Sequence, residues 1–206
     1  MQSKNKDIAV ITLKLLVICA LVALIVAFVN FITKDRIEYN VRVSTAQALT
    51  DIFKDDFDGH SFEVSGEDFI IEEDGATIAK CVIADCTLNK DVKALYVIEN
   101  HNSEPLFYGV SVAPMGFKAE INMLVAINPD LTVKGVKIVS MSETSGIGTK
   151  AQDSGFLSKF AGKNETEAKN VDIISGATKT SKPVIDAVAN ACNQVFVYKT
   201  TVGGDK

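Results

Sequence analysis

Residues 123–139, MLVAINPDLTVKGVKIV, decide the fold class of this chain. Two runs rich in β-branched residues, 123–127 and 133–139, flank an Asn-Pro-Asp-Leu segment whose residue types favour a tight turn. The pattern predicts an antiparallel β-hairpin. Earlier in the chain, similar short runs separated by turn residues occupy positions 69–71, 77–83, 94–99 and 106–112. These runs predict that the hairpin belongs to an antiparallel sheet.

The chain changes character after Met141. Polar and glycine-rich loops follow, with one short helical patch around Phe156 and Phe160. A last helix is expected to begin near Pro183, with Ser181 as its N-cap, because proline suits a first helical turn and serine suits a cap. Strands followed by helices predict an α+β fold rather than a doubly wound parallel sheet.

The first 33 residues are the most apolar part of the chain. Residues 8–33 carry a single charge, Lys14, and residues 15–33 carry none. A helix needs about 20 apolar residues to cross the hydrocarbon core of a bilayer. The apolar region of a cleaved signal peptide is shorter, about 7–15 residues, and ends at a small-residue cleavage site that is missing here. The run therefore predicts a single transmembrane helix.

The expected organisation has four parts. Apolar residues recur at helical spacing from Val43 to Phe53, so a helix should continue beyond the membrane. Positive residues flank both ends of the apolar run in nearly equal number, which leaves its orientation open. The parts are a short tail (1–7), the transmembrane helix (8–33), a juxtamembrane helix and linker (34–60), and a folded domain (61–206).

Composition excludes several classes of function. The formal net charge is −5, so a basic nucleic-acid-binding surface is not expected. Four cysteines without a C-x-x-C motif, together with only two histidines, give no reason to expect a metal or iron–sulfur site. Cys81 and Cys86 are the only close pair of cysteines, and the sequence leaves open whether they form a disulfide.

Two loops could carry chemistry. The first is Glu143 to Lys150. Residues 146–151 loosely fit a G-x-G-x-x-A dinucleotide motif, but the loop follows a hairpin rather than the strand of a βαβ unit. We therefore expect no nicotinamide site there. Its glycines could still expose backbone N–H groups to a flat or anionic ligand, and the alternative is an ordinary surface turn.

The second loop is residues 172–181, just before the expected last helix. Within seven positions it has four hydroxyl residues, Ser175, Thr178, Thr180 and Ser181. Gly176 and Ala177 leave the hydroxyl of Thr178 sterically open to another molecule. A nearby helix N-terminus would favour a phosphate through its N–H groups and dipole. Lys179 could neutralise such a phosphate or could simply be solvated.

The segment Asp172-x-x-Ser175-Gly176-Ala177-Thr178 resembles the motif D-x-x-S/T-G-A-T that a flavin transferase recognises. In proteins with this motif, FMN is attached to the final threonine through a phosphoester. The motif belongs to an FMN-binding domain shared by the G subunit of Rnf complexes and the C subunit of the sodium-translocating NADH:quinone reductase. Residues 143–148 are similar to the E-T-P-G-L-G loop of the same family, with Ser145 and Ile147 in place of proline and leucine.

The resemblance implies roles for individual residues. Thr178 would carry the FMN, and Asp172 would belong to the sequence that the transferase recognises. Residues 116–119, Gly-Phe-Lys-Ala, stand where the family often has a glycine-rich stretch. The resemblance makes residues 61–206 an FMN-binding α+β domain, with no catalytic or metal-binding residue of its own. The other residues expected around the cofactor are Ser175, Gly176, Ala177, Glu143, Thr144, Gly146, Ile147 and Gly148.

The resemblance also implies a function. The chain would be an electron-transfer subunit of a membrane-bound, ion-translocating Rnf complex, passing electrons between the ferredoxin and NAD branches without binding NAD itself. Its partners would be the other membrane subunits and, during maturation, the flavin transferase. The flavin domain would lie on the extracytoplasmic side of the cell membrane. The alternatives are the quinone-reductase C subunit, an anchored flavin-bearing sensor, or a membrane-tethered binding module without redox chemistry.

Overall fold

The computed structural model describes residues 2–66, 68–143, 146 and 148–203. The chain divides into two compact units, Met1–Arg42 and Val43–Lys206. Helix α1 (Gln2–Phe53) begins in the first unit and ends in the second. From Ile11 onward this helix contains a stretch that is long and apolar enough to cross a membrane. None of that stretch is buried against other parts of the described chain.

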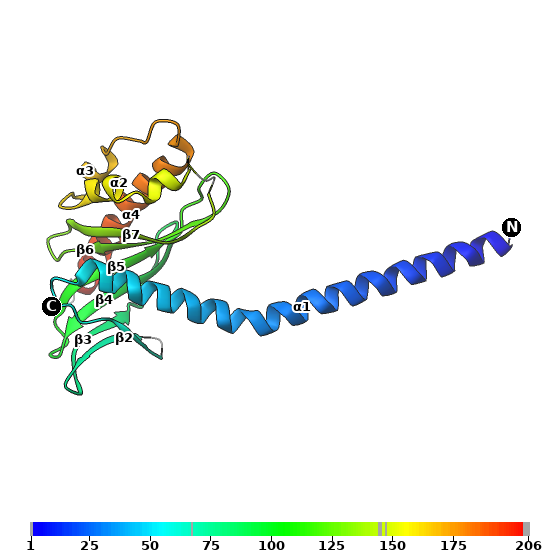
Figure 1. Cartoon of the computed structure of the whole chain (residues 1–206), viewed down its shortest axis with the longest axis horizontal. Coiled ribbons are helices and arrows are strands. Elements are labelled where there is room, and N and C mark those ends of the chain that lie inside the picture. The colour runs from blue at the N-terminus through cyan, green and yellow to red at the C-terminus, as the bar shows by residue number, and fades with distance from the viewer. Residues whose placement is uncertain (1, 67, 144–145, 147, 204–206) are drawn as a thin grey trace. The chain divides into compact units, whose positions relative to one another are not determined.

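The second unit is built on one seven-stranded antiparallel sheet (Figure 1). Neighbours in the sequence are neighbours in the sheet, and the expected hairpin is present as the pairing of Val125 with Val136. The sequence prediction of an antiparallel sheet is therefore confirmed. The strands are β1 (Glu63–Ser65), β2 (Asp68–Glu73), β3 (Ala76–Ile83), β4 (Val92–Asn100), β5 (Pro105–Val112), β6 (Ile121–Ile127) and β7 (Val133–Met141).

Alternate residues of the central strands feed two separate cores. On β6, Leu124 packs in a cluster with Leu49 and Phe53 from the last turns of α1. Its neighbour Val125 packs on the opposite face with Val188 of the last helix. Because successive side chains of a strand point to opposite faces, one helix covers each side of the sheet. Gly135 allows the close approach of α1, since a Cβ there would lie 3.1 Å from Ile52.

The segment after β7 forms η1 (Gly148–Gln152), α2 (Ser154–Leu157), η2 (Ser158–Phe160), α3 (Glu165–Lys169) and α4 (Thr178–Gly203). The expected start of the last helix is wrong, because α4 begins at Thr178 and contains Pro183. The Ala177 carbonyl accepts hydrogen bonds from the N–H groups of Thr180 and Ser181, which closes the first turn earlier. Ser181 is therefore inside the helix rather than its cap. Its hydroxyl donates to the Ala177 carbonyl and accepts from the Ile174 N–H.

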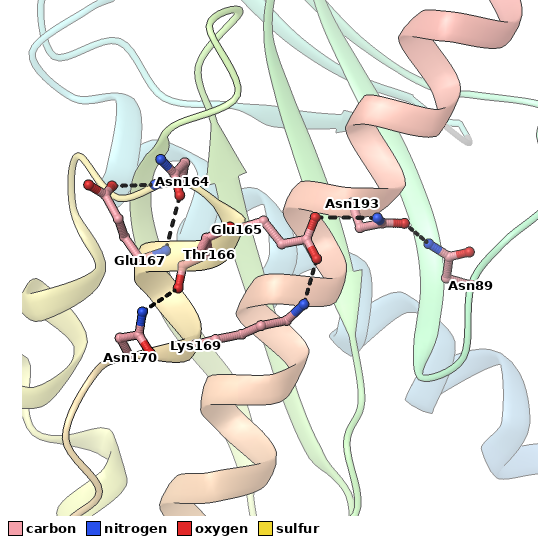
Figure 2. A network of polar contacts seen from close by, with 8 residues as sticks. All are labelled: Asn89, Asn164, Glu165, Thr166, Glu167, Lys169, Asn170 and Asn193. Atoms are coloured by element: carbon pink, nitrogen blue, oxygen red, sulfur yellow. Dashed lines mark hydrogen bonds and ion pairs between the residues drawn. The ribbon is translucent and has the colours of Figure 1, made fainter.

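A polar network fixes α4 to the segments beside it (Figure 2). Glu165 accepts hydrogen bonds from Lys169 and Asn193, and Asn193 in turn accepts one from Asn89. The next residue, Gln194, is fully buried and bonds to the backbone of the loop between β3 and β4. The network fixes α3 and this loop to the middle of α4. These contacts lie well away from the first turn of the helix.

The cysteines do not form a disulfide. Cys81 is buried on β3, and Cys86 is half-buried in the loop that follows. Burial raises the pKa of the Cys192 thiol to about 12, so it stays protonated in the core.

Candidate functional site

A cavity of about 410 Å³ opens at the start of α4. It is bounded by the loop between β5 and β6, the loop after β7, and the turn that leads into α4. The cavity brings together Glu143, Gly148, Gly176, Ala177 and Thr178, which are separated in the sequence but were all expected at one site. Its lining residues are Phe117, Glu143, Gly148, Gly176, Ala177, Thr178, Lys179 and Thr180.

Three further expected residues, Asp172, Ser175 and Gly146, do not line this cavity. Asp172 and Ser175 are exposed on the segment before α4. Gly146 is exposed, has a φ of 76°, and donates its N–H to the Thr149 hydroxyl. Thr144 and Ile147 lie outside the described residues, so their predicted places at the cofactor stay predictions.

Thr178 is the first residue of α4 and its side chain is exposed. The preceding turn needs a left-handed residue, and Gly176 supplies it with a φ of 78°. The first turn of a helix leaves backbone N–H groups without intrahelical acceptors, and the helix dipole adds positive potential there. The Thr178 hydroxyl therefore lies where a phosphate would be favoured and where a ligand can approach it.

Glu143 lies two residues after β7 and its carboxylate is turned inward. Oε1 accepts the Lys118 N–H at 3.0 Å, and Oε2 accepts the Thr180 hydroxyl at 3.1 Å. Burial raises the pKa of Glu143, but these bonds and those from the Ala119 and Phe117 backbone lower it, and the balance lies below the usual value. The carboxylate is therefore held in its charged form by neutral donors.

Phe117 and Lys179 form the rim of the cavity. The Lys179 Nζ lies 5.3 Å from the centre of the Phe117 ring, within range of a cation–π contact. A second hollow of about 480 Å³ shares these two residues and Thr178, and adds Lys182 to its lining. Sequence reasoning gave Phe117 no role. The signal that could have identified Phe117 is its position in residues 116–119, where the resembling family often has a glycine-rich stretch.

The residues present fit an FMN. The two hollows that meet at Thr178 are each within the usual size range of ligand sites, roughly 300–1,000 Å³. Phe117 supplies an aromatic surface beside glycine backbone, which suits a flat ring system, while Lys179 and Lys182 supply positive charge for a phosphate. A larger hollow of about 510 Å³ lies beside the outer edge of β7, but it contains none of the residues expected at the site.

Two protein-family models match the chain. Residues 116–193 match the FMN-binding domain, and residues 1–52 match the RnfG N-terminal region. The first match includes the loop with Phe117, the Glu143 loop and the first turns of α4. The cavity therefore lies inside an FMN-binding domain, and FMN is its cofactor. The second match covers α1, whose apolar stretch makes the chain a single-pass membrane protein.

Several curated relatives are G subunits of ion-translocating oxidoreductase complexes. The chain is 32% identical over 115 residues to the G subunit of the proton-translocating ferredoxin:NAD(+) oxidoreductase complex of Clostridium ljungdahlii, which covers 52% of this chain and 62% of that protein. It is 28% identical to the G subunit of the Na(+)-translocating complex of Acetobacterium woodii, over 88% of each chain. It is 24% identical to the G subunit from Vibrio vulnificus, over 89% of this chain and 87% of that one.

A solved structure is also similar. The crystal structure of Shewanella oneidensis NqrC matches with a TM-score of 0.41 and 26% identity, covering 50% of this chain and 61% of that one.

Proposed function

With an RnfG N-terminal region and an FMN-binding domain on one chain, this protein belongs to the RnfG family, and we propose that it carries covalently bound FMN as the electron-transfer subunit of an Rnf complex. Such a complex would couple electron transfer between ferredoxin and NAD to ion translocation. The relatives in Clostridium and Acetobacterium are named for complexes of this kind. The match of residues 1–52 to the RnfG N-terminal region favours the Rnf complex over the sodium-translocating quinone reductase.

The attachment point is the Thr178 hydroxyl. The observation that carries the proposal is the exposed Thr178 at the first turn of α4, at the rim shared by two hollows. A phosphoester there would hold the phosphate beside the first-turn N–H groups of the helix. Lys179 and Lys182 would offset part of the phosphate charge. A flavin transferase would make this bond, reading the exposed Asp172 and Ser175 on the approach to the helix.

The other residues orient the flavin rather than react with it. FMN supplies the redox chemistry when bound, and the protein supplies position and electrostatics. Phe117 offers a ring face, and Gly148 and Gly176 line the cavity without a side chain. We also propose that Thr144, Gly146 and Ile147 contact FMN, as the family resemblance implies. The bound cofactor would thus be tethered at its phosphate and open to another subunit at its rim.

The intact mass of the full chain tests the attachment. We would co-express the wild type, Thr178→Val and Thr166→Val with a flavin transferase. Thr166 is an exposed helical threonine that lines neither hollow and serves as the matched control. The proposal predicts the mass of FMN less one water on the wild type and Thr166→Val only. An adduct on Thr178→Val, or none on the wild type while the transferase labels a control protein, contradicts it.

We further propose that the flavin domain lies on the extracytoplasmic side, where the resembling family places it. A cysteine introduced at His101, in the exposed turn between β4 and β5, would report the side of the membrane, and the wild type with its four native cysteines gives the background labelling. A membrane-impermeant maleimide should label His101→Cys in intact cells as fully as in opened ones. Labelling only after the cells are opened would place the domain in the cytoplasm.

A further inference from the structure

We infer that Glu143 is a positioning residue: its carboxylate holds the turn at residues 116–119 against the first turn of α4, and so fixes two walls of the cavity. It joins these walls through the Lys118 N–H on one side and the Thr180 hydroxyl on the other. The wall residues that matter most for FMN are Phe117 and Thr178. In sequence, Phe117 adjoins Lys118, and Thr178 lies two residues before Thr180. The consequence for FMN rests on the proposed function, whereas the contact itself does not.

Two glycines make room for this carboxylate. A Cβ at Gly148 would lie 2.7 Å from the Glu143 Cβ and 2.9 Å from Oε2. A Cβ at Gly116 would overlap Oε1 of the same side chain. Neither glycine has a positive φ, so backbone conformation does not demand them. Gly148 was expected to lie around the cofactor, and the structure shows that it also makes room for Glu143.

The donors around Glu143 are all neutral. One oxygen faces the backbone of the 116–119 turn, and the other faces a hydroxyl that is 2% exposed on α4. A charged acceptor makes shorter and stronger bonds to such donors than a neutral one. The turn has one internal bond of its own, from the Gly116 N–H to the Ala119 carbonyl. Glu143 is therefore what connects this turn to α4 through hydrogen bonds among the described residues.

The contact should depend on pH. The pKa of Glu143 lies below its usual value. The stabilisation from its hydrogen bonds is therefore complete at pH values above the usual glutamate pKa, and it is lost as the pH falls through the lowered pKa. Protonation would put a hydrogen on an oxygen that now only accepts. The charged residues near Glu143 on the elements packed around it are Lys118 in the turn, Glu120 beside it, Lys150 on η1, and Lys179, Lys182 and Asp186 on the first turns of α4.

Amide hydrogen exchange of the full chain tests the contact without any flavin. We would compare protection at residues 117–119 in the wild type, Glu143→Ala, Glu143→Gln and the control Glu120→Gln, with β6 amides reporting that each variant is folded. Glutamine can still accept the Lys118 N–H and donate to Thr180, but it cannot titrate. We expect protection to fall at least tenfold in Glu143→Ala, and less in Glu143→Gln and the control.

The pH profile separates positioning from general stability. Wild-type protection at Lys118 should fall as the pH drops below the usual glutamate range, while Glu143→Gln stays flat and β6 stays protected. Equal protection in the wild type and Glu143→Ala, or an unprotected wild-type Lys118 amide, overturns the inference. So does the same pH dependence in Glu143→Gln.

Flavin attachment to the same variants adds a separate readout. The rate of adduct formation at Thr178 should fall in Glu143→Ala and be largely retained in Glu143→Gln. An equal rate in Glu143→Ala and the wild type overturns the link between the contact and the cofactor. No adduct on the wild type contradicts the proposed function alone, because the exchange data stand without FMN.

Discussion

At the start of α4, Thr178 and Lys179 are exposed and line open hollows, whereas farther along the same helix Gln194 is fully buried with both ends of its amide bonded. The first region has backbone and side-chain donors that face a cavity. The second is a closed network in which Asn193 and Glu165 also have partners (Figure 2). The difference teaches that the middle of α4 is fixed by a closed network, whereas the exposed Thr178 and Lys179 of its first turn remain available to a ligand.

The buried amide should give the largest effect on stability. Gln194→Leu leaves the Asn89 N–H and the Thr87 carbonyl without their present partners. These partners are only partly buried, so each lost hydrogen bond costs about 0.5–1.5 kcal/mol, and we expect the free energy of unfolding to fall by about 1–3 kcal/mol. Denaturant unfolding of the full chain measures this. Thr200→Ala, at an exposed position of the same helix, should change it by less than about 0.5 kcal/mol.

The cavity at the start of α4 should be sensitive to added side-chain volume rather than to lost hydrogen bonds. Gly148→Ala places a methyl group against the Cβ of Glu143, which cannot rotate away. Overpacking of this kind costs about 1–3 kcal/mol, and FMN attachment should slow with it. Gly155→Ala is the matched control, since its new Cβ would meet only the end of the Asp153 side chain. Equal behaviour of the two variants would show that the 143–148 loop can move aside.

Acid should weaken the anchored region through Glu165. The hydrogen bonds from Lys169 and Asn193 lower the pKa of Glu165, partial burial raises it, and the balance lies below the usual value. A lowered pKa means that the stabilisation is present above the usual range and is lost as pH falls through the lowered value. Unfolding measured from pH 7 to pH 3 should therefore show a shallower decline for Glu165→Gln than for the wild type. Identical slopes would mean that this carboxylate contributes nothing to the network.

The contact between Lys179 and Phe117 at the rim of the cavity should give the smallest effect on stability. Lys179→Ala removes the cation over the Phe117 ring, a contact worth about 0.5–1 kcal/mol at an exposed position. Lys182→Ala removes the same charge one helical turn away, at a residue with no ring contact among those described. Thermal unfolding of the two variants isolates the ring contact from the charge. An equal loss in Lys182→Ala would assign the effect to charge alone.

Much of the fold could be predicted from local patterns. Alternating β-branched runs located six of the seven strands, and the Asn-Pro-Asp-Leu turn set the hairpin of β6 and β7. The start of α4 could not be predicted, because Pro183 and Ser181 gave a strong local signal that the bonds to the Ala177 carbonyl overrode. Helix α3 was missed because it is a single capped turn, held by the reciprocal bonds of Asn164 and Glu167.

The site was predictable where a motif marked it. The Asp172–Thr178 motif located Thr178, and the structure places Gly176, Ala177 and Glu143 around the same cavity. Phe117 and Thr180 were not predicted, since their contribution depends on how three loops meet in space. The bonds of Glu143 to neutral donors belong to the same category, because no spacing in the sequence relates residue 143 to residues 118 and 180.

The central claim is that FMN is joined to Thr178, and peptide mapping of the flavinylated full chain tests it most directly. Trypsin cuts after Lys169 and Lys179, which gives a peptide of residues 170–179 whose only hydroxyl residues are Ser175 and Thr178. We predict that the FMN adduct is on this peptide and that fragment masses assign it to Thr178. An adduct on Ser175, or on the following peptide that begins at Thr180, would contradict the account.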